Sequence, residues 1–134
     1  MTETRTARCL CGDLSITVTG EPGNVNLCCC AECQRRSGSV FQTSLVFRDE
    51  DIVAYNGARR QFSRPTDRGA EVTLEFCPTC GVSLLFRISD LEGRVLIRGG
   101  CFADPAHPAP THLWFTDKAA PWVTIPEGKV MSRR

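Results

Sequence analysis

Apolar and polar residues alternate along most of this chain, which is the pattern of β-strands that bury one face. In residues 13–20 (DLSITVTG), Leu14, Ile16 and Val18 alternate with serine and threonine, and Gly20 ends the run. Similar patterns predict further strands at residues 44–47, 71–76, 82–88, 94–98 and 112–115. The chain is therefore expected to be mainly β, built from antiparallel strands.

Other segments predict turns, a helix and loops between these strands. Residues 31–38 (AECQRRSG) favour a helical turn that Gly38 ends. Asn56-Gly57 is a typical hairpin turn and predicts a β-hairpin between short strands around Tyr55 and Phe62. The Pro- and Ala-rich residues 101–112 predict a surface loop, and residues 127–134 a loose tail. With no boundary between them, residues 1–134 are expected to form a single domain.

The composition excludes some classes of function but does not identify one. The 134 residues are 42% hydrophobic and 23% charged, as in ordinary globular proteins, and a formal net charge of +1 gives no general attraction to nucleic acid or membranes. The N-terminal residues lack a secretory signal, and no apolar run is long enough to span a bilayer. We expect a cytoplasmic monomer or homodimer.

Nine cysteines are the unusual feature of the sequence. The odd number and the absence of an export signal argue against a disulfide framework. Pairs spaced C-C or C-x-C would also form small, strained disulfide rings, whereas they are well placed to bind a metal. Metal ligation is therefore the favoured interpretation.

Two cysteine pairs far apart in sequence predict a structural zinc site. Cys9 and Cys11 lie in CLCG before the first predicted strand, and Cys77 and Cys80 lie in CPTCG between two strands. Four thiolates form the closed ligand set of structural zinc, with Zn–S distances of about 2.3 Å. The alternative is that these residues are buried free cysteines.

The segment CCCAEC predicts a second, different site. In an extended chain Cys28 and Cys30 point to one side and Cys29 to the other, and a short turn brings Cys33 back toward the first pair. Three protein ligands with an open fourth position are typical of catalytic zinc. Two alternatives stay open: Cys29 is the fourth ligand of a second closed site, or Cys101 is the fourth ligand, a nearby free thiol or simply a small buried residue.

The ordered motifs CLCG, CCCAECQRRSG, CPTCG and HLWFTDKAAPW resemble those of the glutathione-dependent formaldehyde-activating enzyme family, which includes centromere-protein-V-like proteins. The resemblance implies an Mss4-like antiparallel β fold built around zinc. It also implies two Zn²⁺ ions per chain, a structural ion on the four-cysteine set and a more labile, catalytic ion on Cys28, Cys30 and Cys33. The family usually has histidine where this chain has Cys29, and a small residue, leucine and aspartate where this chain has GCFAD.

The resemblance further implies a carbon–sulfur lyase similar to S-(hydroxymethyl)glutathione synthase, with glutathione as cosubstrate and formaldehyde or a related carbonyl as substrate. Arg35 and Arg36 directly follow the third cysteine and are candidate anchors for the glutathione carboxylates, or else solvated surface arginines. His112 is interpreted as structural, with proton transfer as the alternative, and Trp114 and Trp122 as core or pocket wall.

Two other classes of function stay possible from the sequence. A zinc-stabilised interaction module without catalysis would expose a contiguous apolar patch instead of a pocket at the three-cysteine site. A thiol redox sensor would use Cys29 and Cys101 and requires their sulfur atoms to be close together.

Overall fold

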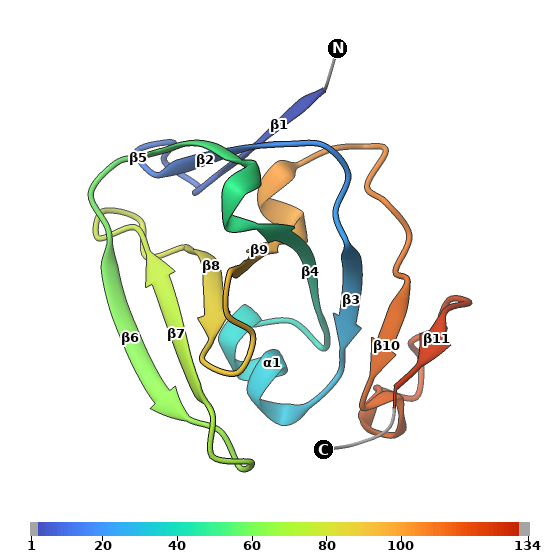
Figure 1. Cartoon of the computed structure of the whole chain (residues 1–134). Coiled ribbons are helices and arrows are strands. Elements are labelled where there is room, and N and C mark those ends of the chain that lie inside the picture. Colours follow the sequence, from blue (N-terminus) through green and yellow to red (C-terminus); the bar gives the residue numbers. More distant parts are fainter. Residues whose placement is uncertain (1–2, 132–134) are drawn as a thin grey trace.

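Two β-sheets and a short helix make up the described residues, 3–131, of the computed structural model (Figure 1). The helix α1 (Ala31–Ser37) and the 3-10 turns η1 (Asp49–Asp51), η2 (Gly99–Phe102) and η3 (Thr116–Lys118) connect strands. The strands are β1 (Thr4–Arg8), β2 (Ser15–Thr19), β3 (Asn24–Cys28), β4 (Gln42–Arg48), β5 (Ile52–Asn56), β6 (Arg60–Pro65), β7 (Glu71–Phe76), β8 (Ser83–Ile88), β9 (Arg94–Arg98), β10 (His112–Trp114) and β11 (Lys129–Val130).

The strands form a three-stranded sheet in the order β1-β2-β5 and an eight-stranded sheet in the order β11-β10-β3-β4-β9-β8-β7-β6. The mainly β prediction is confirmed, and the predicted strands occur at the expected places. Pairing is antiparallel except around β10, which runs parallel to β3 and to β11. No helix within residues 3–131 combines the length and apolar character needed to cross a membrane.

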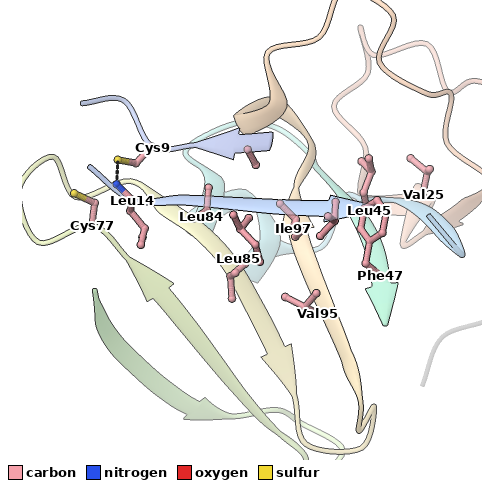
Figure 2. Close-up of a cluster of buried hydrophobic side chains, with 13 residues drawn as sticks. Cys9, Leu14, Val25, Leu45, Phe47, Cys77, Leu84, Leu85, Val95 and Ile97 are labelled. Atoms are coloured by element: carbon pink, nitrogen blue, oxygen red, sulfur yellow. Dashed lines mark hydrogen bonds between the residues drawn. The ribbon is translucent and has the colours of Figure 1, made fainter. Parts of the chain in front are cut away.

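The large sheet is covered on both faces, which explains why its central strands are apolar at successive positions. One face packs on the small sheet through a core that includes Ile16, Leu45, Leu85 and Ile97 (Figure 2). Strand alternation sends the neighbouring residues to the opposite face, where Phe86 and other apolar residues form a second cluster. Figure 1 shows α1 within the curve of the large sheet, against this second face.

The predicted hairpin around Asn56-Gly57 is wrong. Strand β5 pairs with β2 in the small sheet, whereas β6 pairs with β7 in the large sheet. Gly57 has a φ of 112° and lies so close to the backbone carbonyl of Asp13 that a Cβ atom would collide with it. Gly57 is thus needed because its backbone passes close to that of Asp13. After Gly57 the chain passes from the small sheet to the large one.

The predicted loose tail is also wrong in part. Strand β11 pairs with β10, and the amide of Met131 donates a hydrogen bond to the carbonyl of Leu113 at 2.8 Å. Residues 132–134 lie outside the described residues. Strand β1 has no counterpart in the predictions, because its sequence TRTAR buries only Ala7 fully and carries no apolar alternation.

Candidate metal centres

The cysteines of CLCG and CPTCG come together at one end of the main core. Cys9 and Cys11 lie between β1 and β2, and Cys77 and Cys80 lie between β7 and β8. Their four Sγ atoms lie within 4.8 Å of one another. The sulfur of Cys11 is 3.7 Å from that of Cys9 and 3.7 Å from that of Cys77. The cluster therefore joins the small sheet to the large one.

Two tight turns shape this cluster and aim backbone N–H groups at its sulfurs. Gly81 has a φ of 79° and donates its N–H to the carbonyl of Cys77 at 2.8 Å, which closes the second turn. The amide of Leu14 donates to Sγ of Cys9 at 3.3 Å (Figure 2). Hydrogen bonds from the backbone of Val82 and then from that of Cys11 lower the pKa of Cys80 to about 6. Such donors stabilise thiolates over thiols.

The four sulfurs fit zinc by their chemistry and their spacing. A tetrahedral site with Zn–S of about 2.3 Å has sulfur–sulfur edges of about 3.8 Å. The two separations of 3.7 Å agree with that edge length. No disulfide joins cysteines within residues 3–131. This cluster can hold a zinc ion with all four positions filled by the protein.

The second cluster lies where β3 passes into α1. Strand β3 ends at Cys28, and Cys30 keeps an extended backbone with φ −65° and ψ 158° while it caps the helix. Its Sγ accepts a hydrogen bond from the backbone N–H of Cys33, in the first turn of α1, at 3.3 Å. The Sγ atoms of Cys28, Cys30 and Cys33 all lie within 4.8 Å of one another. Gly38 ends the helix with φ 70°, as its sequence indicates.

Cys29 does not belong to this group of sulfurs. Its side chain is fully buried in a separate apolar cluster with Leu27 and Leu113. Burial raises the pKa of its thiol. Cys101 packs instead against the main core, in a different cluster. This separation gives no support to a redox pair of Cys29 and Cys101.

The sulfur of Cys33 is the centre of a polar contact network. Nη2 of Arg36 lies 3.2 Å from it and Nε2 of Gln42 lies 3.8 Å from it. The thiols of Cys28 and then Cys33 lower the pKa of Cys30 by hydrogen bonding, with Arg36 contributing positive charge. Three cysteines surrounded by N–H donors fit a zinc ion that carries excess negative charge from its ligands.

The two arginines after Cys33 differ in their surroundings. Arg36 is half-buried, and its guanidinium lies over the ring of Phe86 at 4.8 Å from the centroid. Arg35 is exposed and lines a small hollow of about 160 Å³ between α1 and strands β6 and β7. The structure thus brings Arg36, but not Arg35, into contact with a cysteine of the cluster.

A larger pocket of about 460 Å³ is lined by residues of α1, β4, β8, β9 and η2, but by none of the three cysteines. Arg36 and Gln42, the two residues that contact the Cys33 sulfur, both line it. Arg98 and Cys101 form part of the other side. The side chains of Arg36 and Gln42 therefore connect this pocket to the sulfur of Cys33.

Sequence reasoning missed Gln42 and Arg98, two buried polar residues of the pocket. The sequence did contain an indication of these two residues. In a strand, Arg98 points to the same face as Leu96, and Gln42 to the same face as Val46, so each places a polar side chain on a face that is otherwise apolar. This pattern indicates a buried polar site only once it is known that the second face of the large sheet is covered.

The aromatic residues and histidine of the late motif are placed differently from one another. Trp114 is half-buried and donates from Nε1 to the side-chain oxygen of Asn26 at 3.1 Å. Trp122 is 75% exposed, so its interpretation as core or pocket wall is wrong. Nδ1 of His112 lies 2.8 Å from Oγ1 of Thr111. The residues that line the pocket include neither tryptophan nor His112.

Comparison with known proteins decides the family. The family model of the glutathione-dependent formaldehyde-activating enzyme matches residues 4–118. The chain belongs to this family. The match covers both cysteine clusters and the pocket. An activity related to glutathione and formaldehyde, with small-molecule substrates, agrees with this membership.

A solved structure supports the fold. A crystal structure of a Rhodobacter sphaeroides protein resembles this chain with a TM-score of 0.60 and 20% sequence identity, over 81% of this chain and 98% of the other. The Mss4-like fold expected for the formaldehyde-activating family agrees with the observed sheets. No curated protein sequence matches the chain.

Proposed function

We propose that this protein is a zinc-dependent carbon–sulfur lyase similar to S-(hydroxymethyl)glutathione synthase, which adds a thiol such as glutathione to formaldehyde or a related small carbonyl in the cytoplasm. One observation carries the proposal: three cysteine sulfurs converge, Arg36 and Gln42 join the Cys33 sulfur to a pocket, and the fourth cysteine of the same segment is buried elsewhere. Three protein ligands would leave the fourth position of a tetrahedral zinc ion to a substrate thiol.

The proposed roles divide the cysteines into two sets. Cys9, Cys11, Cys77 and Cys80 would hold a structural zinc ion, and Cys28, Cys30 and Cys33 a catalytic one. A zinc ion on the second set supplies a strong lowering of the pKa of a bound thiol. Arg36 stabilises the charge on Cys33 through its hydrogen bond, and Gln42 adds a weaker N–H contact.

The reaction itself balances without a further reactant. The thiol sulfur forms a bond to the carbonyl carbon, the carbon–oxygen π bond breaks, and the thiol proton ends on the former carbonyl oxygen. The pocket holds the two reactants together, which contributes by proximity. In the reverse direction the same groups release the carbonyl and the thiol.

The pocket supports catalysis over a purely structural interaction module. Large apolar side chains that are exposed, such as Leu10, Phe62 and Trp122, come from segments far apart in the sequence. The pocket instead combines arginine, glutamine and serine side chains with the apolar side chains of Phe41 and Val82. This mixed lining suits a small molecule with both polar and apolar parts.

The decisive test uses the zinc-loaded protein with glutathione and [¹³C]formaldehyde. NMR exchange spectroscopy measures how fast free glutathione and its hydroxymethyl adduct interconvert at equilibrium. The protein should accelerate exchange above the uncatalysed rate, and Cys30→Ser should abolish the acceleration while the chain stays folded. An exchange rate equal to that without protein, for zinc-loaded wild type, would contradict the proposal.

A further inference from the structure

Arg98, at the end of β9, is a buried cation with no carboxylate partner among the described residues. Its side chain is only 7% exposed. Nη1 donates to the side-chain oxygen of Gln42, and Nη2 donates to Oγ of Ser83 at 3.3 Å. Its Nε is buried without a hydrogen-bond partner, and among residues 3–131 no carboxylate lies within ion-pair distance of the guanidinium.

A second guanidinium shares this environment. Arg36 and Arg98 both lie over the ring of Phe86, at 4.8 Å and 5.6 Å from its centroid. Nε and Nη1 of Arg36 are also buried without partners in the described chain. Burial, and next the like charge of Arg36, lower the pKa of Arg98 to about 10, while the nearby thiols of Cys101 and Cys33 act in the opposite direction. Burying two like charges is costly unless anions compensate them, and three thiolates with a Zn²⁺ ion would carry a net charge of −1 against the two guanidinium charges.

Strand register explains why this charge lies beside the candidate catalytic cluster. In the ladder between β4 and β9, Arg98 pairs with Ser44, and in the ladder between β3 and β4, Gln42 pairs with Cys28. Gln42 and Ser44 are two residues apart, so their side chains share the face that carries α1. The amide of Gln42 accepts from Arg98 through its oxygen and contacts Sγ of Cys33 through its nitrogen. One glutamine side chain thus separates Arg98 from the thiol cluster.

We propose that Arg98, aligned by Gln42 and Ser83, binds a carboxylate of the substrate in the pocket that Arg36 and Gln42 connect to Cys33. This inference rests on the proposed function and specifies its substrates: at least one reactant is a carboxylic acid. A guanidinium presents N–H donors in a planar fork that matches a carboxylate, and Arg36 adds a second positive charge on the same side. The carboxylate belongs either to the thiol, as in glutathione, or to the carbonyl compound, as in a 2-oxo acid.

The test compares charged and neutral members of matched ligand pairs by calorimetry on the zinc-loaded protein. The thiol pair is glutathione and its ester with the glycine carboxylate blocked; the carbonyl pair is glyoxylate and glycolaldehyde. Wild type should bind the carboxylate member of one pair about 10- to 100-fold more tightly, as expected for a hydrogen-bonded charge pair. The pair that shows this preference identifies which reactant carries the carboxylate.

Variants then assign the preference to Arg98. Arg98→Gln should remove the preference for the carboxylate ligand. Arg98→Lys keeps the positive charge but not the planar pair of N–H donors, and should keep part of the preference. Ser83→Asp places a carboxylate beside Nη2 of Arg98 and should also remove the preference, which covers the case that Arg98→Gln fails to fold. Arg94→Gln removes an exposed charge from the same strand and should change nothing.

The outcomes separate this inference from the proposed function. If wild type shows no preference in either pair, or if Ser83→Asp and a folded Arg98 variant both keep it, the carboxylate site is overturned even when thiol addition is measured. If the preference depends on Arg98 but no accelerated exchange occurs, the carboxylate site stands and the proposed reaction fails.

Discussion

Arg36 donates a hydrogen bond from Nη2 to Sγ of Cys33, at 3.2 Å. The two residues are one helical turn apart in α1, so the helix itself holds the donor over the sulfur. Contacts of this kind to a metal ligand stabilise the thiolate that the metal requires.

Arg36→Met should therefore weaken zinc binding at the three-cysteine cluster about 10- to 100-fold. Arg36→Lys keeps the charge and should lose less. Competition with a chromophoric chelator measures the affinity, and Arg35→Met, which removes an exposed neighbouring charge, should match wild type in this assay. Equal zinc affinities in Arg36→Met and wild type would show that this hydrogen bond has no role in metal binding.

Zinc-replete protein should hold two zinc ions per chain with unequal affinity. Cys77→Ser opens the closed cluster and should give unfolded or insoluble protein, because structural zinc contributes on the order of 10 kcal/mol to folding. Cys30→Ser should give folded protein with one zinc ion and little activity. Metal analysis, circular dichroism and thermal melts check both variants.

Mild chelation provides the matching test on the unmodified chain. It should remove one zinc ion while the circular dichroism spectrum is unchanged, and a stronger chelator should remove the second ion together with the fold. A protein that stays folded without any zinc would refute the structural role, and identical melts for the two serine variants would refute the division of the cysteines.

Cys29→Ala should keep both zinc ions. The thiol of Cys29 is fully buried among apolar residues, away from the other three sulfurs of its segment. Removing it leaves a small cavity, at a cost to the free energy of unfolding of about 1 kcal/mol. Zinc content and affinity are compared with wild type and with Cys28→Ala, which should lose the second ion. A loss of zinc in Cys29→Ala equal to that in Cys28→Ala would make Cys29 a ligand.

Tyr55→Phe should lower the free energy of unfolding by about 1–3 kcal/mol. The hydroxyl of Tyr55 in β5 donates to the buried carboxylate of Glu75 in β7 at 2.6 Å, so the bond links the two sheets. Gln61→Ala is the control variant. It removes the other side-chain donor to Glu75 but leaves the hydrogen bond from Tyr55 in place. Urea denaturation at pH 8 measures the three proteins.

The stabilisation that the Tyr55–Glu75 hydrogen bond contributes should decrease at high pH. Burial and then Glu75 raise the pKa of Tyr55 above its ordinary value of 10. A raised pKa in the folded state favours the protonated form, so the stabilisation is complete below about pH 10 and is lost as the pH rises toward the folded-state pKa. Tyr55 is the only tyrosine of the sequence, so its absorbance reports the titration directly. A midpoint at pH 10 in the folded protein would contradict the hydrogen bond.

Local patterns predicted much of this molecule. The hydrophobic pattern located β2 in the small sheet and most strands of the large one, but not β1 or β11, and Gly38 marked the end of α1. The spacing of CCCAEC indicated that Cys29 would face away from its neighbours, because side-chain direction in an extended segment depends only on local geometry. The roles assigned to the cysteines stay predictions.

Features that depend on distant contacts were not predictable in the same way. Asn56-Gly57 has the composition of a hairpin turn, yet β5 and β6 pair with strands that the local sequence does not specify. The tail gains structure only from its contact with β10. Arg98 looks like an ordinary strand end until the register shows that it faces a covered side of the sheet.

The two cysteine clusters differ in how much of the chain must be synthesised before their members can meet. The three-cysteine cluster is complete once Cys33 has left the ribosome. Cys11 must wait for Cys77, which follows 66 residues later. At a synthesis rate of about 5–20 residues per second, the wait is roughly 3–13 s. The segment proposed to carry the exchangeable metal is therefore the first on the nascent chain able to capture an ion, before the pocket that uses it has formed.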